Sequence, residues 1–101
     1  MTLSFKNMLK AQKKFSDEFF TCENLSEFEK IEMHKTFCLA LHDEVSQMSD
    51  AVHYKHHRDT TTPTNRQKIL YENVDIIRYC LATLNLWEFK DEDFLDAFDA
   101  K

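Results

Sequence analysis

The chain has 101 residues, of which 43% are hydrophobic and 31% are charged, and its formal net charge is −5. This length predicts a single domain with its own core, and the acidic balance argues against a general nucleic-acid-binding surface, which requires a basic stripe. Glycine is absent and proline occurs once, so the chain lacks the residues of tight hairpins and glycine-rich phosphate loops, and long helices are expected.

The three cysteines further limit the class of protein to which this chain can belong. Cys22, Cys38 and Cys80 are an odd number without paired metal-ligand spacing, and no signal peptide or long apolar run accompanies them. We therefore expect reduced thiols in a cytoplasmic protein that contacts neither a membrane nor a nucleic acid polymer. Cys38 and Cys80 are expected to fill core positions.

Two amphipathic helices are predicted in the first half of the chain. The first runs from about Ser4 to Phe20, with its apolar side formed by Phe5, Met8, Leu9, Gln12, Phe15 and Phe19. Ser26 and Glu29 fit a capping box, which predicts the start of a long helix that continues to about residue 55. Its apolar residues recur at alternating steps of three and four, as in a helix packed lengthwise on a partner: Ile31, His34, Cys38, Leu41, Val45, Met48 and Val52.

Two further helices are predicted in the second half. The polar segment 59–63 ends in proline and predicts a loop, after which Thr64 and Gln67 fit another capping box. The third helix has an apolar stripe of Leu70, Val74, Ile77, Leu81 and Leu84. Asp91 is expected to cap a short last helix. The pattern predicts an all-α, four-helix-type bundle with two long antiparallel helices, completed by homo-oligomerisation as a homodimer or a dimer of dimers.

Acidic residues occur at matching spacings on the two long helices. Glu44 and Gln47 are three residues apart, as are Glu72 and Asp75, so each pair shares one helix face. Either cluster alone is typical of a solvated helix surface. Together they favour a divided magnesium site, because Mg²⁺ takes carboxylate oxygens, keeps some waters and bridges proteins to substrate phosphates.

With these motifs, the sequence resembles the all-α nucleoside triphosphate pyrophosphohydrolases, the MazG-like superfamily with its EExxE and ExxD motifs. The dimeric dUTPase and dCTPase branch looks closer. Its Pro-Trp-Lys-His-Trp stretch is similar to residues 53–57, where Lys55 and His56 match. Its Met-Leu-x-Leu-Gln-x-x-Leu-Asn segment is similar to the segment that begins at Met8 and contains Gln12. The resemblance covers most of the chain.

The resemblance implies hydrolysis between the α and β phosphates of a nucleoside triphosphate, with Mg²⁺ or Mn²⁺ as cofactor. It also implies a role for each matching residue. The catalytic metal ligands would be Glu44, Glu72 and Asp75, with Gln47 as a further ligand and Asp43 and Asp50 in an outer shell. The phosphates would be bound by Lys55 and Arg58, and the base by Gln12.

The sequence also departs from the family's pattern. Gln47 stands where the family has a metal-binding glutamate, and Ser16 stands where the branch has asparagine, so metal affinity is expected to be lower and the base stays undecided. We expect a single domain, residues 1–101, that lacks the C-terminal phosphate-binding segment of the family. The alternative is a helical module that binds a nucleotide or a protein without turnover. A zinc site is a less favoured interpretation, because His53 and His57 are four residues apart and can share one helix face.

Overall fold

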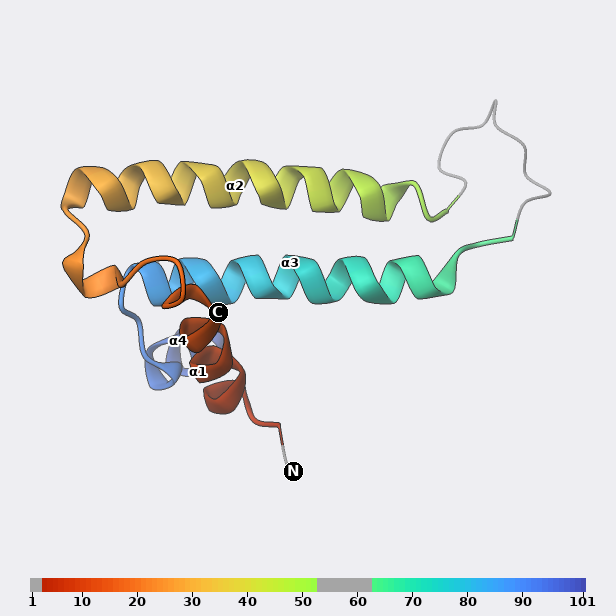
Figure 1. The fold of residues 1–101 in the computed structure, drawn as a ribbon. Coiled ribbons are helices and arrows are strands. Elements are labelled where there is room, and N and C mark those ends of the chain that lie inside the picture. Colours follow the sequence, from red (N-terminus) through yellow and green to blue (C-terminus); the bar gives the residue numbers. More distant parts are fainter. Residues whose placement is uncertain (1–2, 53–62) are drawn as a thin grey trace.

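The computed structural model describes residues 3–52 and 63–101, and Figure 1 shows their arrangement. This part of the chain is helical and has no strand, which confirms the predicted all-α class. The elements are α1 (Phe5–Ser16), the short 3₁₀ turn η1 (Cys22–Asn24), α2 (Glu27–Ser49), α3 (Arg66–Leu86) and α4 (Asp91–Ala100).

Side-chain caps fix where the helices begin. The predicted capping box at α2 is confirmed, because Ser26 Oγ accepts from the Glu29 backbone N–H and the Glu29 carboxylate accepts from that of Ser26. The other two predicted caps were wrong by one residue. Asn65, rather than Thr64, caps α3 by accepting from the Lys68 N–H, and α4 is preceded by Lys90, whose N–H donates to Asp93.

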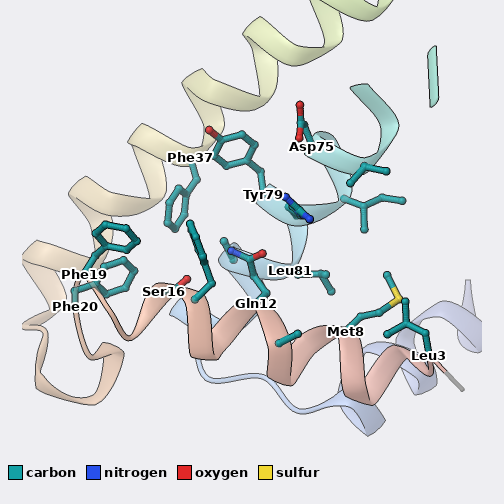
Figure 2. A pocket seen from close by; sticks show the side chains of 16 residues that line it. Leu3, Met8, Gln12, Ser16, Phe19, Phe20, Phe37, Asp75, Tyr79 and Leu81 are labelled. Carbon is teal, nitrogen blue, oxygen red and sulfur yellow. The ribbon is translucent and has the colours of Figure 1, made fainter. Parts of the chain in front are cut away.

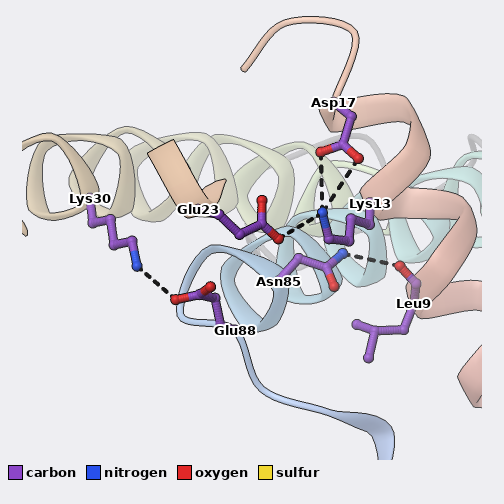
Figure 3. A network of polar contacts seen from close by, with 7 residues as sticks. All are labelled: Leu9, Lys13, Asp17, Glu23, Lys30, Asn85 and Glu88. Carbon is purple, nitrogen blue, oxygen red and sulfur yellow. Dashed lines mark hydrogen bonds and ion pairs between the residues drawn. The ribbon is translucent and has the colours of Figure 1, made fainter. Parts of the chain in front are cut away.

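Helices α1 and α2 end earlier than predicted. At α1, the Phe19 N–H donates to the Ser16 carbonyl, which tightens the chain into a turn, and Lys13 pairs with Asp17 and Glu23 around that turn (Figure 3). After Ser49, the buried Ala51 accepts a backbone hydrogen bond from Asn65, just before α3. The end of α1 is therefore set by contacts within the following turn, and the chain after α2 is held by a contact with the segment before α3; helical periodicity reports neither.

Figure 1 shows α2 and α3 side by side over most of their lengths. Residues early in α2 contact the two residues that follow α3, residues in the middle of α2 contact the second half of α3, and residues late in α2 contact the first half of α3. The contacts are the Lys30–Glu88 ion pair at 3.0 Å, the hydrogen bond from Trp87 Nε1 to His34 Nδ1 at 3.0 Å, the Phe37–Tyr79 ring contact, and Asn73 Nδ2 with Met48 Sδ at 3.4 Å.

Helix α1 packs on the C-terminal end of α3. All four buried residues of α3 lie there: Leu81, Ala82, Asn85 and Leu86. The Asn85 side chain donates to the Leu9 carbonyl at 3.1 Å, so the buried amide fixes α1 against α3 (Figure 3). Phe5 of α1 stacks on Phe94 of α4, with ring centroids 4.7 Å apart.

The core is smaller than the apolar stripes predicted. No residue of α2 is buried, and on α3 Leu81 is buried whereas Leu70, Val74 and Ile77 of the same stripe are exposed. Cys80 is exposed, so its prediction as a core residue was wrong, and Cys38 is half-buried. The reason is that α1 packs on α3 only near the C-terminal end of α3, while α4 packs on α1 (Figure 1). Within the described ranges, no helix combines the length and the apolar character needed to span a membrane.

Candidate metal centre and adjoining cavity

Three carboxylates from the two long helices meet at one place. Glu44 comes from α2, and Glu72 and Asp75 come from one face of α3. Each offers an oxygen, all within 4.8 Å of one another, and all three side chains are half-buried. The i, i+3 spacing aligns Glu72 with Asp75, and the pairing of α2 with α3 brings Glu44 to them.

The electrostatics of this cluster are unfavourable without a cation. A hydrogen bond with Glu72 comes first among the causes that raise the pKa of Glu44 to about 7, followed by partial burial and the negative charges of Glu72, Asp75 and Asp43. Like charges held close together favour the protonated form of one of them. Near neutral pH, Glu44 is therefore present in both its protonated and its ionised form.

One oxygen of the cluster is suited to bind a cation. Glu72 Oε2 is buried and has no hydrogen-bond partner, and a buried carboxylate oxygen without a partner costs free energy. A divalent cation would satisfy this oxygen and neutralise the three carboxylates together. The donor set is entirely oxygen, which suits Mg²⁺ and Mn²⁺.

The other acidic-site residues of the prediction lie around this cluster. Gln47 is exposed and lies one helical turn after Glu44 on α2. Asp43 is exposed, and its charge acts on Glu44. Asp50 is exposed at the C-cap of α2. The roles of Gln47 as a ligand and of Asp43 and Asp50 as outer-shell groups stay predictions.

A cavity of about 800 Å³ adjoins the cluster, because Asp75 is part of its wall. It lies between α1 and α3, with Phe37 added from α2 (Figure 2). Figure 2 shows Phe19 and Phe20 at one end and Leu3 and Met8 at the other. This volume and the mostly apolar wall are typical of small-molecule sites.

Gln12 lies in this cavity wall, on α1, across from the α3 residues that include Asp75 (Figure 2). Sequence reasoning placed Gln12 at a base, and here its amide, together with the Ser16 hydroxyl, is the polar part that α1 adds to apolar surroundings. Aromatic rings and an amide together can hold a flat heterocycle by stacking and hydrogen bonding.

Sequence reasoning did not assign Phe37 and Arg78 of the cavity wall to a site. Arg78 follows Asp75 by three residues, so the same helical spacing that grouped the acidic residues also indicates it. It brings a permanent positive charge into the cavity wall that also contains Asp75. The predicted phosphate-binding residues Lys55 and Arg58, together with His53 and His57, lie outside the described residues.

Comparisons with protein-family models, curated proteins and solved structures found no match to this chain.

Proposed function

We propose that this protein is a magnesium-dependent nucleoside triphosphate pyrophosphohydrolase with a role in clearing unwanted nucleotides. It would add water across the anhydride between the α and β phosphates and release a nucleoside monophosphate and pyrophosphate. The convergence of Glu44, Glu72 and Asp75 carries this proposal, because three carboxylates whose oxygens lie within 4.8 Å call for a cation.

The proposed roles are divided between the carboxylate cluster and the adjoining cavity. Glu44, Glu72 and Asp75 would hold Mg²⁺, or Mn²⁺ in its place, with Gln47 assisting from the next turn of α2. When bound, the ion would neutralise phosphate charge and lower the pKa of a coordinated water. The cavity wall, with Gln12 and its aromatic rings, would hold the base and exclude water from it.

Arg78 supports the phosphate side of this proposal. A nucleoside triphosphate carries more negative charge than one divalent cation neutralises, and a guanidinium binds phosphate oxygens in a two-pronged geometry. Arg78 lines the same cavity wall as Asp75, so it is available to the chain of phosphates that leads from the base to the metal. Lys55 and Arg58 are proposed to add to it.

We also propose that α2 and α3 form an antiparallel pair within a bundle that a second copy completes, as a homodimer or a dimer of dimers. The reversed order of their contacts supports the antiparallel pairing. The absence of any buried residue on α2 supports the need for further cover.

Pyrophosphate release from a panel of canonical and modified nucleoside triphosphates, with Mg²⁺ or with a chelator, tests the proposed function. Preference for dUTP or dCTP would identify a narrow pyrimidine enzyme, and turnover of many substrates would identify a housecleaning enzyme. Glu72→Gln should abolish release while preserving helicity, with Glu32→Gln as a matched control on the exposed surface of α2.

The second candidate is a module that binds a nucleotide or a protein without turnover. The neutral Gln47 beside the carboxylate cluster favours it, since this position supplies no fourth negative charge. Magnesium binding without pyrophosphate release from any nucleotide of the panel would select this candidate.

A further inference from the structure

A hydrogen bond between two rings joins α2 to the corner that links α3 and α4. Trp87 Nε1 donates to His34 Nδ1 at 3.0 Å, and the two rings meet edge to face with their centroids 5.9 Å apart. Both side chains are half-buried. Loss of this bond would leave the indole N–H without its partner in a partly buried position, which costs free energy.

The bond can form with only one protonation state of His34. An indole N–H donates and cannot accept, so His34 Nδ1 is the acceptor and carries no proton in the bonded form. The neutral ring then carries its proton on Nε2. In the doubly protonated ring both nitrogens donate, so no rotation of the ring offers an acceptor to Trp87. The bond is therefore lost when His34 becomes an imidazolium.

The backbone of the corner does not hold this arrangement by itself. Glu88, which follows Trp87, has a φ of 60°, in the left-handed region that favours glycine, and the chain contains no glycine. The Glu88 carboxylate pairs with Lys30 of α2 at 3.0 Å. Two side-chain contacts therefore attach the corner to α2. The contact that includes a histidine is suited to respond near neutral pH, because imidazoles gain their second proton between about pH 8 and about pH 5.

The charged groups around His34 compensate one another. Lys30 lies one helical turn before His34 on α2, and its partner Glu88 comes from the corner. Glu23 of η1 is within the electrostatic reach of Lys30 and forms its own ion pair with α1. On α3 and just after it, residues 83–87 include no charged side chain. The need of the indole for an acceptor therefore decides how this contact responds to acid.

The bond lies next to a ring contact that lines the cavity. Phe37 follows His34 by three residues on α2 and contacts Tyr79 of α3, with ring centroids 6.2 Å apart. Both rings belong to the cavity wall (Figure 2). The position of Phe37 in this wall therefore depends on how closely this part of α2 packs on α3.

We propose that the hydrogen bond between Trp87 and His34 is a pH-sensitive latch. It closes α2 onto the α3–α4 corner while His34 is neutral, and it opens when acid places a second proton on His34. Opening separates Phe37 from Tyr79 and so loosens the wall of the cavity. The inference does not rest on hydrolysis, because the latch acts on the packing of α2 whichever molecule the cavity binds.

Nitrogen–proton NMR of the full chain between about pH 8 and about pH 5 tests the latch. Trp87 is the single tryptophan, so the spectrum contains one indole N–H signal. On acidification this signal should move upfield, as expected for an N–H that loses its acceptor, and the nuclear Overhauser contacts between the Phe37 and Tyr79 rings should weaken.

Two variants separate His34 from the other titrating groups. His34→Asn offers an amide oxygen as acceptor and does not titrate, so its indole signal and ring contacts should stay constant over the same pH range. His42→Asn is the matched control, because His42 is exposed on the same helix, and it should show the wild-type changes.

A wild type with a constant indole signal and constant ring contacts would overturn the inference, and so would the same changes in His34→Asn. A shifted indole signal with intact ring contacts would also overturn it, because His34 would then titrate without opening the latch.

If His34→Asn loses its helices in circular dichroism, chemical denaturation of the wild type and Trp87→Phe carries the test. The ratio of their folding equilibrium constants should fall about two- to tenfold from about pH 8 to about pH 5, because only the wild type has this hydrogen bond to lose. Comparison at each pH cancels the titration of the carboxylate cluster. A ratio that does not change with pH would reject the latch.

Discussion

Magnesium binding should depend on pH through Glu44. Its pKa is about 7, and a carboxyl group must lose its proton before it can bind a metal ion. The ionised fraction of a group with this pKa is about one in eleven near pH 6 and about ten in eleven near pH 8. The apparent affinity for Mg²⁺ should therefore rise about tenfold over this interval and level off above it.

Isothermal titration of the protein with MgCl₂ at constant ionic strength measures this change. Glu44→Gln removes the titrating group, so its binding should be weaker and nearly independent of pH over the same interval. Glu32→Gln removes an exposed carboxylate from the same helix and should retain the wild-type pH dependence. Equal affinity near pH 6 and pH 8, or an unchanged pH profile in Glu44→Gln, would refute the reasoning.

Glu44 also affects the stability of the metal-free protein, and its stabilising contribution falls as pH rises. The pKa of Glu44 in the folded protein lies above its ordinary value of 4.5, so the folded state binds this proton more tightly than the unfolded state. Its contribution to stability is complete below about pH 4.5 and is lost as pH rises through about 7. Thermal unfolding without metal should show this loss, and saturating Mg²⁺ near pH 8 should reverse it.

Three further changes test other parts of the account. Gln47→Glu should tighten magnesium binding in the same titration, because it adds a fourth carboxylate next to Glu44; weaker binding would show that the position does not face the ion. Arg78→Gln should raise the KM for a nucleoside triphosphate and leave Mg²⁺ affinity nearly unchanged, and an unchanged KM would remove Arg78 from the phosphate site. Leu86→Ala should lower the free energy of unfolding by about 2–5 kcal/mol in chemical denaturation, because Leu86 is fully buried, and a loss below about 1 kcal/mol would show that the end of α3 is not the core.

Local sequence signals predicted the four helices and the cap of α2, and they missed the caps of α3 and α4 by one residue each. The Ser26–Glu29 capping box is a contact between residues three apart, so the sequence contains all of it. The cap of α3 was assigned to Thr64 instead of Asn65 because both residues are good caps and their choice depends on the chain around them.

Burial could not be predicted from the same patterns. Leu70, Val74, Ile77 and Leu81 form one stripe on α3, yet only Leu81 is buried. The difference comes from α1, which crosses α3 near Asn85 and leaves the earlier turns uncovered. Periodicity shows which residues share a face, and only the tertiary arrangement decides how much of that face is covered.

For the same reason, only part of the candidate site could be predicted from the sequence. The spacing of Glu72 and Asp75 is local, so their shared face followed from the sequence. The meeting with Glu44 depends on how α2 and α3 are aligned, and Phe37 and Arg78 become cavity residues only because α1 folds back over α3. These contacts are between segments far apart in the sequence, and no local pattern contains them.

Phosphorus NMR of a nucleoside triphosphate incubated with the protein and Mg²⁺ shows which phosphate bond is cleaved, because it distinguishes pyrophosphate from orthophosphate. We expect a nucleoside monophosphate and pyrophosphate as products, and no reaction with Glu72→Gln or in the presence of a chelator. Orthophosphate with a nucleoside diphosphate, or the same product formation by Glu72→Gln as by the wild type, would contradict the proposed hydrolysis at the carboxylate cluster.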